Sequence, residues 1–190
     1  DLSQKLTGLA SASTLFTKFT SGVKRVVEGF GSLVGAVETY ASEGDRIAKT
    51  SRLVGLSVKD YQAFGDAARH AGMSTEEMDG ALKRFNVNLG RARAGDAKAF
   101  KVFDSILGGQ DLSKFKDSTS LLKEIAEGYN KLGSAEEKAF VSQELFGKSG
   151  LRMSELLGEG GEALQKKLDS AKAGYSEQGA KDAEAFEDAL

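Results

Sequence analysis

The feature that most constrains the fold is a heptad pattern in the first forty or so residues. Counting position a from Leu2, apolar residues occupy nearly every a and d position over close to six heptads, and only Lys5 interrupts them. This 3.5-residue spacing keeps one apolar stripe on one face, which is typical of a coiled coil. An unbroken helix of about 40 residues would be about 60 Å long. The residues predicted to form an interface along this stripe are Leu2, Leu9, Phe16, Phe19, Val23, Val26, Phe30, Leu33, Val37 and Tyr40.

The sequence leaves two possibilities for the surface that packs against this apolar stripe. Gly8, Gly22 and Gly29 all lie at position g, and each costs about 1 kcal/mol relative to Ala inside a helix. The helix therefore needs packing to be ordered. We expect copies of the chain or a partner to supply that packing. The alternative is that the helix is part of the core of its own domain.

The pattern changes after residue 43 to short helices with clear starts and stops. The segments 55–60 (GLSVKD) and 72–77 (GMSTEE) share one order: Gly, an apolar residue, Ser, and an acidic residue three positions after the Ser. A Gly ends one helix and a Ser begins the next, as in a capping box. Segment 134–137 (SAEE) repeats the box. The sequence thus predicts helix starts at Ser57, Ser74 and Ser134.

These patterns predict an all-α fold, in which a long N-terminal heptad helix precedes a compact array of short amphipathic helices. The chain contains no Pro, which would end or kink helices, and no window shows the alternation of a strand. We expect an arm at 1–43 and a compact multi-helix domain at 44–190, together forming a piece of a longer protein. The predicted helices span 3–41, 44–54, 57–71, 74–94, 96–107, 118–132, 134–147, 150–157, 161–173 and 177–189.

Three features that resemble catalytic or ligand motifs have simpler explanations. Residues 147–149 (GKS) match the end of a P-loop, but the first Gly of that motif is missing and a helix precedes it. We interpret Gly147 as a helix stop. His70, the only His, stands in the last turn of a predicted helix, where the helix dipole favours it. The chain has no Cys, so thiolate metal sites are excluded. We expect no metal, no cofactor and no enzymatic activity.

The charges do not indicate a nucleic-acid binder. The formal net charge is −2, whereas such proteins are usually basic with many cations on one face. The densest basic group is interpreted as a solvated helix face. Its members are Lys83, Arg84, Arg91 and Arg93.

The order of motifs along residues 43–190 resembles that of phage tail tape measure proteins. The segments that carry the resemblance are EGDRIAKTSRLVGLSVKDYQAFGDAARHAGMSTEEMDGALKRF (43–85), GDAKAFKVF (95–103), LLKEIAEGYNKLGSAEEKAFVSQELFGKSG (121–150) and SELLGEGGEALQKKLDSAKAGY (154–175). Each motif alone only marks the start or end of a helix, and the resemblance lies in the order and spacing of the motifs. The apolar heptad helix that precedes them also fits this family.

The resemblance implies a structural protein that occupies the tail tube of a long-tailed phage and sets tail length through its own length. It implies a location inside the virion tail, and in the host cytoplasm during assembly. The implied partners are copies of the same chain, other tail proteins or a tail assembly chaperone, with contact to the host membrane during infection. No catalytic residue is carried over from the family.

Two other functions fit parts of the sequence. The stretch FTKFTSGVKRVVEGF (16–30) is amphipathic and cationic, as in helices that lie on membranes, so a pore-forming or envelope-penetrating protein is one alternative. The most apolar window (26–37) is too short for a transmembrane helix. A helical adaptor domain is the other alternative.

Overall fold

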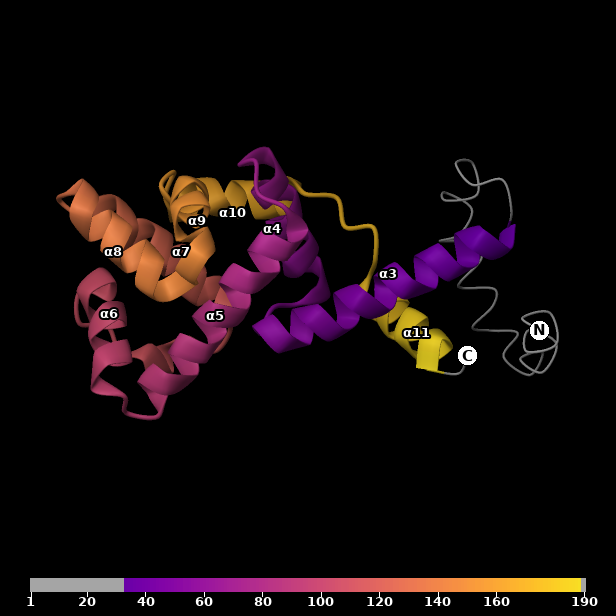
Figure 1. Ribbon diagram of the computed structural model, residues 1–190, viewed down its shortest axis with the longest axis horizontal. Coiled ribbons are helices and arrows are strands. Elements are labelled where there is room, and N and C mark those ends of the chain that lie inside the picture. The colour runs from indigo at the N-terminus through magenta and orange to yellow at the C-terminus, as the bar shows by residue number, and fades with distance from the viewer. Residues whose placement is uncertain (1–32, 189–190) are drawn as a thin grey trace. The chain divides into compact units, whose positions relative to one another are not determined.

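The computed structural model describes residues 33–188, and all regular structure in that range is helical (Figure 1). The all-α prediction is therefore confirmed for the described residues, while most of the predicted arm lies outside them. The helices are α3 (Leu33–Val54), α4 (Val58–His70), α5 (Thr75–Arg93), α6 (Ala97–Leu107), η3 (Leu112–Lys114), α7 (Ser118–Lys131), α8 (Ala135–Phe146), η4 (Gly147–Ser149), α9 (Gly150–Leu157), α10 (Gly161–Ser170) and α11 (Glu177–Asp188).

The chain divides into two compact units. One, the helical array, comprises Ser51–Ala173 and contains the last turn of α3 and all helices from α4 to α10. The described part of the other, the α3–α11 pair, comprises residues 33–50 and 174–188. The predicted division into 1–43 and 44–190 stays a prediction, because residues 1–32 lie outside the described part.

The helix starts predicted from Ser residues are confirmed. At the start of α5, the backbone N–H of Glu77 donates to Ser74 Oγ (3.2 Å), and the Glu77 carboxylate accepts from the Ser74 N–H (2.9 Å). Ser134 and Glu137 form the same reciprocal box before α8. These bonds satisfy N–H groups that a helix N-terminus leaves without partners.

The box predicted at Ser57 is only half formed. Ser57 Oγ accepts from the backbone N–H of Asp60 (3.0 Å), as expected. The Asp60 carboxylate instead accepts a hydrogen bond from Thr119 Oγ1 (2.9 Å), which belongs to α7. The prediction of a reciprocal box here was wrong because a long-range partner holds the shorter Asp side chain.

The break predicted between residues 41 and 44 is also wrong, since α3 continues through Gly44 to Val54. Gly44 is buried, and a Cβ placed on it would lie 2.5 Å from the Cβ of Ala183 in α11. This Gly permits the close approach of two helices and does not end one. The other predicted boundaries that fall within the described residues, from 54 to 177, agree with the structure within three residues.

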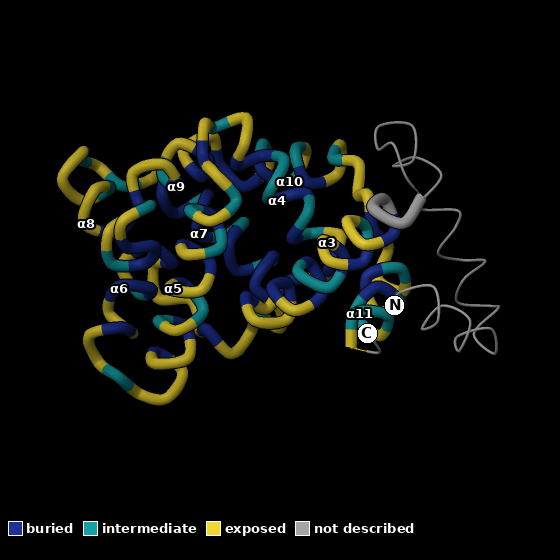
Figure 2. Tube along the Cα trace, turned by 45° about the vertical axis from the view of Figure 1, so that its right-hand side comes forward, coloured by how far each residue is buried: buried dark blue, intermediate teal, exposed yellow. Residues whose placement is uncertain are grey.

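Aromatic side chains fill the centre of the helical array. Phe85 of α5 lies edge-on to Phe103 of α6, with ring centroids 5.8 Å apart, and stacks on Phe146 of α8 at 5.7 Å. Gly128 lets α7 approach α6, because a Cβ there would overlap the carbonyl oxygen of Ile106. Buried and exposed stretches alternate along these helices (Figure 2), as expected for amphipathic helices packed around one core.

Candidate functional site

The predicted interface residues fall mostly outside the described part of the chain. Those outside it are Leu2, Leu9, Phe16, Phe19, Val23, Val26 and Phe30. Leu33 begins α3, and Val37 and Tyr40 follow in its second turn. The prediction of an interface with a partner therefore stays a prediction.

Val37 and Tyr40 pack against the C-terminal segment of their own unit. Val37 is buried in a cluster with Ala41 and Ala183. The Tyr40 ring stacks on that of Tyr175, with centroids 4.4 Å apart, and Tyr175 Oη donates to the Tyr40 carbonyl oxygen (2.8 Å). Burial raises the pKa of the Tyr175 phenol well above its usual value, so this hydroxyl stays a hydrogen-bond donor. At this end of the stripe, residues of the same chain therefore pack against the apolar side chains.

The heptad register that starts at Leu2 continues to the end of α3. The next a and d positions after Tyr40 are Gly44, Ile47, Ser51 and Val54, and all four are buried. In the part of α3 that the structure describes, the face that carries the stripe is thus packed against the rest of the chain. It does not stop at residue 43.

His70 ends α4, as predicted. Its ring lies exposed at the helix end, with Nδ1 2.8 Å from the Asp66 carbonyl oxygen, one turn earlier. Among residues 33–188 no group of three or more His, Cys, Asp or Glu side chains could hold a metal ion. The geometry around His70 is that of a solvated helix terminus.

Residues 147–149 form the short 3₁₀ turn η4 between α8 and α9. Gly147 has φ of +65°, which favours Gly, and its N–H donates to the Gln143 carbonyl at the end of α8. A Cβ placed on Gly147 would lie 2.6 Å from Cδ of Arg84. The missing side chain therefore leaves room for the stem of an Arg from α5.

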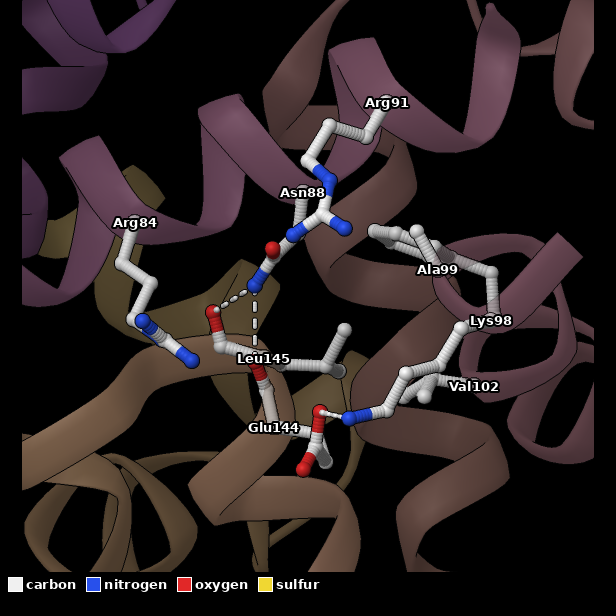
Figure 3. A pocket seen from close by; sticks show the side chains of 9 residues that line it. Arg84, Asn88, Arg91, Lys98, Ala99, Val102, Glu144 and Leu145 are labelled. Atoms are coloured by element: carbon white, nitrogen blue, oxygen red, sulfur yellow. Dashed lines mark hydrogen bonds and ion pairs between the residues drawn. The ribbon is translucent and has the colours of Figure 1, made fainter. Parts of the chain in front are cut away.

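A pocket of about 150 Å³ opens beside this Arg, between α5, α6 and α8 (Figure 3). Charged side chains from three helices converge here beside apolar ones. The residues that line it are Arg84, Asn88, Arg91, Lys98, Ala99, Val102, Phe103, Glu144 and Leu145.

Asn88 fixes the relation of α5 to α8 at the centre of the pocket. Its side-chain amide donates to the carbonyl oxygens of Glu144 (2.7 Å) and Leu145 (3.4 Å), which are in the last turn of α8 (Figure 3). Carbonyl groups at a helix C-terminus have no partner inside the helix. Asn88 supplies one and holds the wall of the pocket in place.

Two ion pairs border the pocket. Arg91 binds Asp96 Oδ2 through Nη2 (2.6 Å) and Nε (3.1 Å). Asp96 also accepts from the Ala99 N–H and so caps α6; this hydrogen bond and that from Arg91 lower the pKa of the carboxyl group. Lys98 Nζ lies 3.9 Å from Glu144 Oε2.

The sequence predicts that the basic group at 83–93 is a solvated helix face. The side chains are indeed exposed, but Arg84 and Arg91 also line the pocket, which the sequence did not predict. A signal was present, since Arg84, Asn88 and Arg91 are spaced i, i+4, i+7 and share one face of a helix. What the sequence lacked was the partner surface on α6 and α8.

Comparisons with protein-family models, curated proteins and solved structures found no match to this chain. Within residues 33–188, every helix is too short or too polar to cross a membrane.

Proposed function

We propose that this chain is a non-catalytic structural part of a phage tail tape measure protein. The N-terminal arm would associate with copies of itself inside the tail tube, and the helical array would dock to another tail protein or to an assembly chaperone. No cofactor takes part. Contact with the host membrane would come only at infection, through the cationic stretch at 16–30.

The observation that carries this proposal is the continuity of the heptad register. The phase that begins at Leu2 is still occupied by buried residues at Ile47 and Val54. A ruler must convert residue number into length, which an extended helix does at about 1.5 Å per residue. A heptad helix that runs in phase into a capped helical array fits a ruler joined to a docking module.

The length of the tail tests the ruler directly. In a phage that carries this chain, deletion of residues 9–29 removes three heptads and keeps the register. We expect tails shorter by about 32 Å, as 21 residues of helix predict, when tails are measured by electron microscopy. The substitution Lys18→Gln, at a c position outside the stripe, is the control and should leave tail length unchanged. Tails of normal length after the deletion would contradict the proposal.

The solution mass separates this function from that of a helical adaptor. The adaptor is favoured by one observation, which is that Val37 and Tyr40 pack on their own chain. Light scattering should find 1–190 as a defined oligomer and 33–190 as a monomer if the arm bundles. This truncation is chosen because α3 begins at Leu33. Monomers in both cases would favour the adaptor.

A further inference from the structure

The α5–α6–α8 pocket has an unbalanced charge. Arg84, Arg91 and Lys98 contribute three positive charges, and Asp96 and Glu144 contribute two negative ones. Arg91 is held by Asp96 at 2.6 Å, and Lys98 faces Glu144 at 3.9 Å. One positive charge is left without a partner.

That charge belongs to Arg84. Its guanidinium makes no hydrogen bond and no ion pair with any residue in the described part of the chain. Its stem lies over Gly147, and its guanidinium lies beside the end of α8 (Figure 3). A guanidinium in this position offers a fork of N–H donors, whose geometry suits the two oxygens of a carboxylate.

Part of the pocket lining is apolar. Ala99, Val102 and Phe103 of α6 and Leu145 of α8 form it. A volume of about 150 Å³ is below the range of about 300–1,000 Å³ typical of pockets for whole small molecules. It is sufficient for one side chain. The ligand should therefore combine a single negative charge with a short apolar stem.

We propose that this pocket binds an acidic side chain, Glu or Asp, from a peptide segment of a partner protein. The carboxylate would pair with Arg84, and its methylene groups would contact Val102 and Leu145. A doubly charged phosphate fits less well, because the Glu144 carboxylate lies in the pocket wall and only one positive charge is uncompensated. This inference does not rest on the proposed function, since an adaptor would use the pocket in the same way.

A pair of small peptides tests the proposal on the full chain. The probe is acetyl-Leu-Glu-amide, the neutral control is acetyl-Leu-Gln-amide, and inorganic phosphate is the competing anion. We expect the Glu peptide to shift the backbone amide signals of Ala99, Val102 and Leu145 in ¹H–¹⁵N NMR spectra. The Gln peptide and phosphate should shift them at least about tenfold less at equal concentration, as expected when a charge-assisted pair is lost.

Matched variants locate the binding site. Arg84→Gln should weaken binding of the Glu peptide at least about tenfold. Lys83→Gln removes the same charge from the adjacent position, which does not line the pocket, and should leave binding unchanged. The dispersion of the remaining amide signals verifies that each variant is folded.

Several results would overturn the proposal. One is the absence of shifts with the Glu peptide up to on the order of 20 mM, a concentration that would detect even weak binding. Equal binding of the Gln peptide would show that the negative charge does not contribute to binding. Equal or tighter binding of phosphate would show that the pocket binds anions in general and does not select a carboxylate. If Lys83→Gln and Arg84→Gln weakened binding of the Glu peptide equally, the binding would depend on the overall charge of the protein and not on Arg84.

Discussion

The helical array and the α3–α11 pair are built from similar helices but have very different cores. In the array, whole aromatic and aliphatic side chains are removed from solvent, among them Phe64, Phe85, Phe103, Leu121, Leu122 and Ile125. In the described part of the pair, the apolar cluster consists of Val37, Ala41 and Ala183, with Tyr40 and Phe186 only partly buried. Both regions have apolar residues at helical spacing, so the periodicity alone does not distinguish them.

The difference shows where the stability of each region comes from. Burial stabilises in proportion to apolar area, at roughly 25 cal/mol per Å², so large side chains dominate the array. The pair depends on close approach, in which Gly44 faces Ala183 and Tyr40 stacks on Tyr175. Regions with few buried apolar contacts open locally at lower free energy. We therefore expect the pair to open before the array unfolds.

The largest expected effect is in the centre of the array. Phe85 is fully buried and contacts two other rings. Phe85→Ala should lower the free energy of unfolding of the array by about 3–5 kcal/mol, measured by urea denaturation followed by circular dichroism. Phe100→Ala is the control, because Phe100 is 45% exposed, and it should change the stability much less. Similar losses in both variants would mean that the centre of the array is not its main source of stability.

The same substitution should act in opposite directions in the two regions. Gly44→Ala places a Cβ 2.5 Å from Ala183 Cβ and 2.8 Å from the Tyr175 ring, and overpacking of this kind costs about 1–3 kcal/mol. A gain of about 1 kcal/mol in helix propensity offsets part of that cost. We expect the amides of α11 to exchange with solvent about fivefold to tenfold faster, which corresponds to about 1 kcal/mol.

Gly80→Ala is the matched variant in the array. Gly80 is exposed within α5, and apart from its chain neighbours and the backbone of its own helix, no atom lies within 4 Å of the position that a Cβ would take. This change should raise the stability of the array by up to about 1 kcal/mol. If Gly44→Ala slowed the exchange of α11 amides, or Gly80→Ala destabilised the array, the contrast between close approach and open surface would be wrong.

The smallest effect is a pH dependence at the pocket. Hydrogen bonds from the Ala99 N–H and Arg91 lower the pKa of Asp96 below its usual value of 3.8. Because the folded-state pKa is depressed, the carboxylate stabilises the array above pH 3.8, and this contribution is lost as the pH falls through the folded-state pKa. Asp96→Asn keeps a capping side chain and removes the charge. The stability of the wild type should therefore fall more steeply than that of Asp96→Asn between about pH 4 and 2, as followed by thermal unfolding.

An equal slope in both proteins would mean that Asp96 titrates alike in the folded and unfolded chains. Asp104→Asn is a suitable second comparison, because Asp104 lies on the same helix and outside the pocket lining.

Local signals in the sequence predicted most helix boundaries. The boxes at Ser74 and Ser134 involve residues three apart, so spacing alone identifies them. The failures involve distant partners. From the local sequence, Gly44 looks like a helix stop, but in the structure it faces Ala183 of α11. Asp60 likewise looks like half of a capping box, but its carboxylate accepts a hydrogen bond from Thr119.

The pocket was missed for the same reason. The i, i+4, i+7 spacing of Arg84, Asn88 and Arg91 places them on one face, but the same spacing is common on solvated helices. The pocket on that face also requires Glu144 and Leu145, which lie more than fifty residues later in the sequence. No periodicity within α5 contains this information.

The two units have a nested topology, since the segments of the α3–α11 pair flank the helical array in the sequence. Within the array, α10 packs back against α4, so its first and last long helices lie side by side (Figure 1). A domain whose ends lie close together can be inserted into another with little disturbance of the host. In evolutionary terms, the array has the topology of a guest domain and α3 with α11 that of its host, with α3 continuing into the guest as its first turn.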